Sequence, residues 1–183
     1  KAKRKPFSER NIILVKGYEH IFGRGLNIVK ALQKITNIHT QFQIVVYGSH
    51  NEVTDYIDAN NLPYKYFGRH NLLHHEVLEL LGKSLIHIGN SVSDGCSNTL
   101  LEAVIMGAFP IQSNPGGVGE EIINNDNGFL INDAENIEEI KELILKAISN
   151  IKTLEDAFKY NTTIMSDKLK FNQFSDKINN LYI

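Results

Sequence analysis

Two carboxylates eight positions apart, Asp94 and Glu102, flank a short polar run in the middle of the chain. The run begins with Gly95 and Cys96 and continues with three residues of types that cap helices, Ser97, Asn98 and Thr99. If a helix begins near Ser97, its first backbone N–H groups have no partners within the helix and attract an anion, phosphate above all. A phosphate cradle between two carboxylates that accept hydrogen bonds from hydroxyl groups suits a sugar attached to a phosphate.

The same two carboxylates allow a second chemistry, because a pair of acidic residues also serves as acid and base in glycoside hydrolysis. The neighbouring anion-binding groups favour a phosphate-bearing ligand over a neutral glycan. Cys96 has no partner histidine that the sequence can assign, so a small loop residue and a nucleophile at a helix N-terminus are both compatible with it. Either carboxylate alone would be an ordinary surface residue, and only the combination points to a site.

A second candidate is Arg24, which stands between Gly23 and Gly25, after an apolar run and before a helical stripe. Glycines let the backbone approach a ligand, and arginine pairs with phosphate through two hydrogen bonds. The loop lacks the spacing of a dinucleotide-binding fingerprint, and an ordinary surface arginine is the competing interpretation. We expect no metal site, because no further ligand group accompanies the cluster His70, His74, His75 and Glu76.

Short apolar runs that end at turn residues predict six strands, near residues 11–16, 42–47, 64–67, 84–88, 109–113 and 128–131. Segments with a helical spacing of apolar residues alternate with them, near residues 26–35, 52–59, 75–81, 97–106, 118–123 and 137–149. The tail, from residue 153 to residue 183, is polar and helical. This alternation predicts an α/β fold, a doubly wound, Rossmann-like parallel sheet of six strands with helices on both faces. Such sheets bind ligands at the carboxyl ends of their strands.

The bulk properties narrow the classes of function. The chain has 183 residues, which predicts one domain, and a net charge of −2, which provides no basic field for nucleic acid. Its single cysteine excludes an internal disulfide and a multi-cysteine zinc site. No apolar run approaches the roughly 20 residues of a membrane span, and no signal peptide is visible. The chain does not begin with Met, which is consistent with a fragment of a longer protein.

Residues 91–117 and 128–131 resemble the nucleotide-sugar-binding half of retaining GT-B glycosyltransferases, the glycosyl transferases group 1 family. That family has a carboxylate, usually Glu, followed by Gly, and a Glu eight positions after the first. Asp94 is one methylene shorter than Glu, which leaves the sugar preference open. The match extends over about residues 11–150 and includes Gly17, the pair Arg24-Gly25 and the turn Phe67-Gly68-Arg69.

The resemblance implies a role for each matching residue. Glu102 would bind the ribose hydroxyl groups, while Asp94 and nearby backbone N–H groups would hold the donor sugar. Arg24 takes the place of a diphosphate-binding lysine of the family. The family arginine after the first glycine is Tyr18 here, so Lys16 or His20 would supply that charge. Arg24 and Asp94 are thus the implied catalytic residues, and the implied donor-binding set is Lys16, Gly23, Gly25, Phe67, Gly68, Arg69, Gly95, Cys96, Ser97, Asn98, Thr99 and Glu102.

The family enzyme has two such domains, and this chain resembles the C-terminal, donor-binding one. Residues 1–183 would form that domain, with a core at about 11–150 and closing helices at 151–183. The N-terminal acceptor domain is absent, so the fragment alone is expected to be inactive and the apolar residues of its tail to be exposed or paired with one another.

The implied reaction moves a glycosyl group, with retention, from a nucleoside diphosphate-sugar to a glycan or lipid-linked acceptor. Neither a cofactor nor an obligate metal is expected. The resemblance suggests bacterial polysaccharide biosynthesis in the cytoplasm, with peripheral contact at the inner face of the membrane, and no nucleic-acid partner. Two alternatives stay open. One is another GT-B enzyme, such as a sugar-nucleotide epimerase, and the other is a non-catalytic module that binds a nucleotide sugar or a protein partner.

Overall fold

The structure is a computed structural model of the chain. It describes residues 4–93, 97–116, 123 and 126–169. The predictions for Asp94, Gly95 and Cys96 lie outside the described residues, as do most of the helix expected at 118–123 and the last part of the tail.

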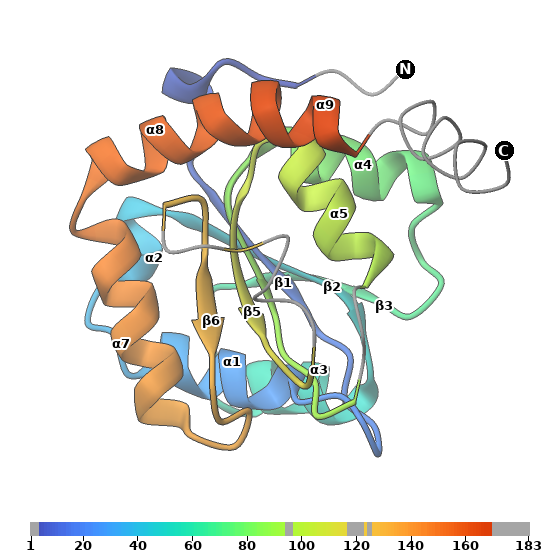
Figure 1. The fold of residues 1–183 in the computed structure, drawn as a ribbon. Helices are drawn as coiled ribbons and strands as arrows, with labels where there is room; N and C mark the ends of the chain where they lie inside the picture. Colours follow the sequence, from blue (N-terminus) through green and yellow to red (C-terminus); the bar gives the residue numbers. More distant parts are fainter. Residues whose placement is uncertain (1–3, 94–96, 117–122, 124–125, 170–183) are drawn as a thin grey trace, which may run out of the picture.

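The described residues form one sheet of six parallel strands in the order β3-β2-β1-β4-β5-β6 (Figure 1). The strands are β1 (Ile12–Lys16), β2 (Gln43–Ser49), β3 (Lys65–Gly68), β4 (Ser84–Gly89), β5 (Phe109–Ser113) and β6 (Phe129–Ile131). The chain builds outward from β1 to β3, crosses back to β4 beside β1, and builds outward again to β6. The predicted doubly wound, Rossmann-like α/β fold is therefore confirmed.

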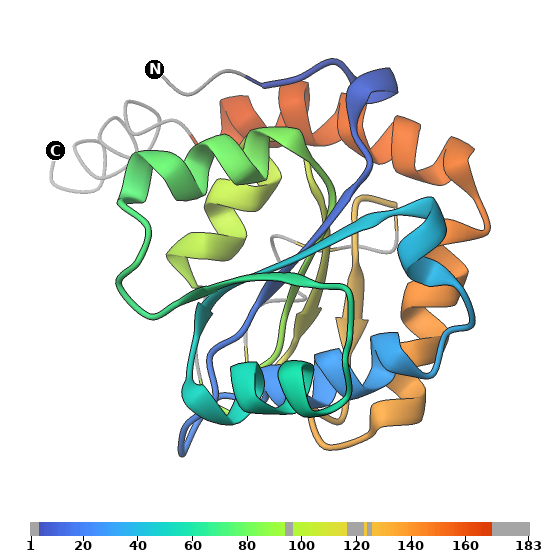
Figure 2. The same ribbon diagram turned by 180° about the vertical axis from the view of Figure 1, so that it is seen from behind.

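Helices cover both faces of this sheet. The longer ones are α1 (Gly25–Gln33), α3 (Asn51–Ala59), α4 (His74–Lys83), α5 (Asn98–Ile105), α7 (Ile137–Ile148) and α8 (Ile151–Tyr160). Short helical segments add η1 (Phe7–Glu9), α2 (Ile38–Gln41), η2 (Asn161–Met165) and α9 (Ser166–Lys168). Figures 1 and 2 show α1 and α3 side by side along one face, next to α7, and α4 with α5 on the other.

The apolar strands are explained by burial on both faces. In β1, Ile13 and Val15 pack into a core with α1, α3 and α7, whereas Ile12 and Leu14 pack against α4 and α5. A strand covered on both sides needs no polar alternation. The central strands are therefore largely apolar along their length, although β4 also carries the buried polar residues Ser84 and His87.

The two ends of the described chain meet at the amino edge of the sheet, away from the carboxyl ends of the strands. The buried Arg10 donates to the carbonyl oxygens of Ser84 and Met106, both at 2.8 Å. Its guanidinium also lies 4.7 Å from the ring centroid of Phe158 on α8. Burial lowers the pKa of Arg10 to about 10, with the nearby charge of Arg4 as a second cause.

The described part of the tail packs on the domain, which corrects the expectation of exposed or self-paired apolar residues. Leu154 and Met165 are buried in the core, although Ile164 is exposed. The close approach is possible because Gly107, with φ of +83°, ends α5 without a side chain, and an added Cβ would stand 2.8 Å from Phe158. Tail and sheet thus form one unit over these residues.

Candidate functional site

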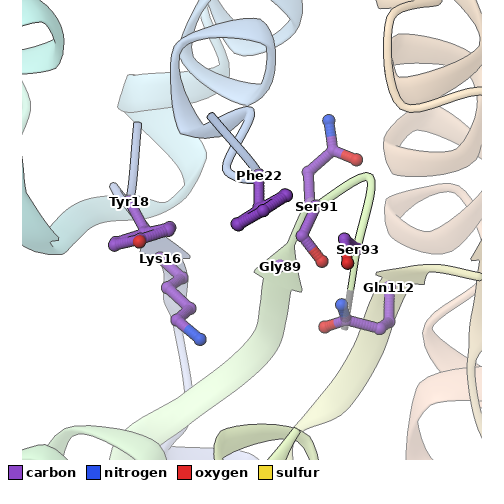
Figure 3. Close-up of a pocket in the computed structure, with 8 residues that line it drawn as sticks. Lys16, Tyr18, Phe22, Gly89, Ser91, Ser93 and Gln112 are labelled. Atoms are coloured by element: carbon purple, nitrogen blue, oxygen red, sulfur yellow. The ribbon is translucent and has the colours of Figure 1, made fainter. Parts of the chain in front are cut away.

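The strand order reverses between the neighbouring strands β1 and β4. Doubly wound folds bind their ligands at this switch point, at the carboxyl ends of the strands. A cavity of about 330 Å³ lies there. It is lined by Lys16, Tyr18, Phe22, Gly89, Asn90, Ser91, Ser93 and Gln112, which come from the ends of β1, β4 and β5 and the loops that follow (Figure 3). We call this space the crossover cavity.

The loop after β1 is held against the loop after β4 by backbone hydrogen bonds. Arg24 N–H donates to Asn90 O at 3.0 Å, and Val92 N–H donates to Phe22 O at 2.8 Å. The N-terminus of α1 then packs directly on the end of β1, because a Cβ on Gly25 would stand 2.8 Å from the carbonyl carbon of Gly17. This close packing fixes the wall of the crossover cavity that carries Tyr18 and Phe22.

Two buried oxygen atoms of the cavity lining have no hydrogen-bond partner within the described part of the chain, Asn90 Oδ1 and Ser91 Oγ. The amide nitrogen of Asn90 is already used, since it donates to Ala134 O at 2.8 Å. Buried polar atoms in proteins are almost always satisfied. A ligand with several hydroxyl groups would supply the missing partners.

Arg24 is not among the residues that line the crossover cavity. Its Nε donates to Glu135 in an ion pair, and its Nη1 donates to Gly23 O at 2.7 Å and to His20 O at 3.1 Å. The hydrogen bond from Arg24 is also the main cause that lowers the pKa of Glu135. An anion would have to draw the guanidinium from Glu135, so the diphosphate role of Arg24 stays a prediction.

Helix α5 begins where the sequence predicts it. Ser97 is its N-cap, and the Ser97 Oγ accepts a hydrogen bond from Leu100 N–H at 3.2 Å. The first N–H groups of such a helix point out of its N-terminal end, towards the loop that joins it to β4. The helix therefore presents a partial positive charge at its N-cap, Ser97, four positions along the chain from Ser93 of the cavity lining.

Glu102, one turn into α5, is paired with a histidine from the neighbouring helix. His74 Nε2 lies 2.7 Å from Glu102 Oε1, and the Glu102 side chain is 26% exposed. His74 is the first residue of α4, whose start is fixed because the Glu76 carboxylate accepts from Leu73 N–H at 2.7 Å. Sequence analysis grouped His74 with its sequence neighbours and missed this pairing.

A buried polar pair lies below the first turn of α5. Tyr47 Oη and His87 Nε2 are 3.0 Å apart, and Thr99 of α5 is near enough to Tyr47 to oppose part of the rise in its pKa. Burial lowers the pKa of His87 to about 3, with the charge of Lys16 as a smaller cause. Burial likewise raises the pKa of Tyr47. Both groups are therefore neutral at physiological pH and act as hydrogen-bonding supports.

A second group of side chains lies at the ends of β2 and β3. The guanidinium of Arg69 sits 5.7 Å from the ring centroid of Tyr18, and its Nη1 lies 3.2 Å from His50 Nε2. His50 Nδ1 accepts from Glu19 N–H at 3.1 Å, so a neutral His50 ring carries its hydrogen on Nε2, facing Arg69. Phe67 and Gly68 end β3 directly before this group.

The structure thus divides the predicted donor-binding set. Of its described members, Lys16 alone lines the crossover cavity, while 97–99 and Glu102 lie on α5 and 67–69 at the end of β3. Gly23, Arg24 and Gly25 form the base of the loop after β1. The predicted set lacks the other seven lining residues, Tyr18, Phe22, Gly89, Asn90, Ser91, Ser93 and Gln112. Their signal was positional, since all lie at or just after the carboxyl ends of three central strands.

Within the described ranges, no group of three or more His, Cys, Asp or Glu side chains is arranged to hold a metal ion. No helix among the described residues is both long and apolar enough to cross a bilayer.

The sheet order defines a doubly wound α/β domain, a class of fold that binds ligands at the switch point, and the crossover cavity lies at that point. The particular family follows from sequence. The model of glycosyl transferases group 1 matches residues 7–164, and the chain belongs to this family. None of the proteins with curated functions matches this sequence.

Solved structures share the fold. S. aureus TarM, in a structure with UDP, fondaparinux and α-GlcNAc-glycerol, is 18% identical with a TM-score of 0.79, over 98% of this chain and 37% of TarM. Anabaena HepE with UDP and glucose is 16% identical with a TM-score of 0.74, over 96% of this chain and 49% of HepE. The pneumococcal O-GlcNAc transferase GtfA, with UDP and GlcNAc, is 21% identical with a TM-score of 0.71, over 98% and 36%. This chain therefore spans less than half the length of each of these proteins.

Proposed function

We propose that this chain is the donor-binding domain of a retaining glycosyltransferase and that it binds a nucleoside diphosphate-sugar at the crossover cavity. The observation that carries the proposal is the pair of unpartnered oxygens, Asn90 Oδ1 and Ser91 Oγ, in the crossover cavity. The lining residue Ser93 precedes Ser97, the N-cap of α5, by four positions. Sugar hydroxyl groups both donate and accept, so they match such a lining. The helix terminus matches the diphosphate next to the sugar.

In this assignment the sugar lies against Asn90, Ser91 and Gln112, and the diphosphate lies between Lys16 and the first N–H groups of α5. The nucleoside then extends along α5, where Glu102 accepts hydrogen bonds from the ribose. The base meets the backbone of 67–69. Asp94 is proposed from the family resemblance to hold a further sugar hydroxyl group.

The chemical work of this domain is to stabilise a leaving group. Negative charge grows on the nucleoside diphosphate as its bond to the sugar breaks, and positive groups fixed in advance at that point lower the barrier. Lys16 and the α5 dipole are such groups. Arg24 would join them by exchanging its carboxylate partner Glu135 for the diphosphate.

The remaining parts of the reaction are assigned to the rest of the enzyme. A second domain would bind a glycan or lipid-linked acceptor, at the cytoplasmic side of a membrane, and would close over the donor. Neither a cofactor nor a protein-bound metal is proposed, because the lysine, the helix terminus and Arg24 address the charge of the diphosphate. The chain alone is expected to bind the donor without transferring its sugar.

Donor binding is tested by calorimetry of the chain with UDP-, GDP- and ADP-sugars. We expect one nucleotide class to bind and the Glu102→Ala variant to bind it at least tenfold more weakly, about 1.4 kcal/mol. The matched control is Glu79→Ala on α4, because the Glu79 side chain makes no hydrogen bond or ion pair with the described residues and lies outside the crossover cavity. If no nucleotide sugar binds, or if Glu102→Ala binds like the unaltered chain, the assignment is wrong.

A further inference from the structure

The pairing of His74 with Glu102 joins α4 to α5 and also determines how the Glu102 carboxylate is hydrogen-bonded. A carboxylate only accepts hydrogen bonds, so the 2.7 Å contact requires that His74 Nε2 carries a hydrogen. This holds for the neutral and for the charged ring. The bond fixes the Glu102 carboxylate from one side, through Oε1 alone.

The Glu102 carboxylate keeps acceptor capacity in this arrangement. Its two oxygens offer about four lone-pair sites, of which His74 occupies one. Two neighbouring hydroxyl groups of a ribose need two of the remaining sites. The histidine therefore holds the acceptor without blocking it.

The exposures of the two side chains indicate which partner is fixed and which side faces solvent. The Glu102 side chain is 26% exposed, whereas the His74 side chain, on the adjoining helix, is 70% exposed. The backbone of His74 is fixed by the capped first turn of α4. A long glutamate side chain loses rotamer entropy when it binds a ligand, and a partner that holds it beforehand reduces that cost.

We propose that His74 is a positioning residue for the donor nucleoside, which holds the Glu102 carboxylate in the orientation that accepts the ribose hydroxyl groups. The inference rests on the proposed donor-binding function. It adds that recognition of the nucleoside depends on α4 as well as on α5, so that the nucleoside is bound between two helices joined by one hydrogen bond.

A purely structural tie between the helices is the competing explanation, and the two predict different measurements. A structural tie contributes to unfolding stability and leaves ligand affinity unchanged. A positioning role appears in the dissociation constant and disappears when Glu102 is absent.

The experiment is a double-mutant cycle on binding of UDP, GDP and ADP, measured by calorimetry with the nucleotide that binds best. We expect His74→Ala to raise the Kd about fivefold, or about 1 kcal/mol, and His74→Gln, which retains a donor, to bind within twofold of the unaltered chain. In the Glu102→Ala background, His74→Ala should have no further effect. His75→Ala is the matched control, and its Kd should not change. His75 is the next residue of α4, is exposed, and has no side-chain partner within the described part of the chain.

The possible outcomes separate the two proposals. The positioning role is overturned if the effects of His74→Ala and Glu102→Ala on the Kd are additive. It is also overturned if His74→Ala binds as tightly as the unaltered chain. Either result leaves the donor-binding function standing. A loss of stability in His74→Ala with an unchanged Kd identifies a structural tie and also overturns it. If the unaltered chain binds none of the three nucleotides, the donor-binding function fails and the inference fails with it.

Discussion

The Gly89→Ala substitution tests the assignment of the crossover cavity to the sugar of the donor. Gly89 ends β4, and the amide of Gln112 from β5 lies directly over it. A Cβ on Gly89 would stand only 2.3 Å from Gln112 Oε1 and 3.2 Å from its Cδ. The backbone of Gly89 has no positive φ, so the effect of alanine comes from this contact and not from backbone strain.

The magnitude follows from what holds the Gln112 amide in place. Ordinary contact requires the amide to move by roughly 1 Å. The hydrogen bond from Gln112 Nε2 to Ser113 Oγ is long at 3.4 Å, so breaking it costs at most about 1 kcal/mol. Because Gln112 lines the crossover cavity, the displaced amide takes up space in it. We therefore expect a small loss of stability and a large loss of sugar affinity.

The assay compares a nucleotide sugar with the same nucleotide without its sugar. Gly89→Ala should raise the Kd of the nucleotide sugar at least tenfold, about 1.4 kcal/mol, and change the Kd of the free nucleoside diphosphate less than twofold. The melting temperature should fall by no more than about 4 °C. The double variant Gly89→Ala/Gln112→Ala restores the space and should recover part of the affinity.

Two results would refute this reasoning. One is a folded Gly89→Ala protein that binds the nucleotide sugar as tightly as the unaltered chain. The other is an equal loss of affinity for the sugar-bearing and sugar-free nucleotides, which would place the sugar elsewhere.

Three further predictions concern stability and its link to binding. His87 has a folded-state pKa of about 3, below its unfolded value of about 6.5, so the unfolded state binds the proton preferentially at low pH. From pH 6.5 to pH 5, the free energy of unfolding should therefore fall by about 2 kcal/mol through this group. Urea unfolding of the His87→Gln variant should lack that part of the pH dependence. Ser97→Ala should cost about 1 kcal/mol in thermal unfolding and should also weaken nucleotide binding. Arg10→Ala leaves two buried carbonyl oxygens without their donor and should cost about 3 kcal/mol or more in urea unfolding.

Matched variants decide each of these. For Ser97, the control is Asn150→Ala, which removes the cap of α8 and should cost similar stability without affecting nucleotide binding. For Arg10, it is Arg4→Ala, which removes one exposed hydrogen bond and should be nearly neutral. The His87 prediction is contradicted if the stability of His87→Gln falls with pH as steeply as that of the unaltered chain. The Ser97 prediction is contradicted if both cap variants bind the nucleotide equally, and the Arg10 prediction if both arginine variants are equally stable.

The sequence predicted the fold because its strands carry an unambiguous signal. A run such as Ile12–Lys16, buried on both faces, has few interpretations apart from a central parallel strand, and the N-cap Ser97 marks the start of α5. The short α2 was missed because its four residues hold little helical periodicity. The tail was predicted as helical but not as packed, because packing depends on partners such as Gly107 that are distant in sequence.

The candidate site was predicted less completely, for a related reason. Arg24 and Glu135 are 111 positions apart, and His74 and Glu102 are 28 apart. Neither pairing has a signature in local spacing, so the sequence indicated the residues and not their partners. The residues that line the crossover cavity could not be predicted for another reason. Residues such as Tyr18, Ser91 and Gln112 have no distinctive sequence pattern, and only the strand order brings them together.

The contact of Arg10 with Phe158 has a mechanical consequence. It joins the beginning of the sheet to the tail on the edge opposite the crossover cavity, where Figure 1 shows α8 and α9. A force that separates Arg4 from Lys168 would act first on the contacts of Arg10 with Phe158 and Met106 and on α8. It would act on the cavity only after these contacts have broken. We therefore expect tension applied through Arg4 and Lys168 to act on the amino edge of the sheet before it acts on the edge that carries the crossover cavity.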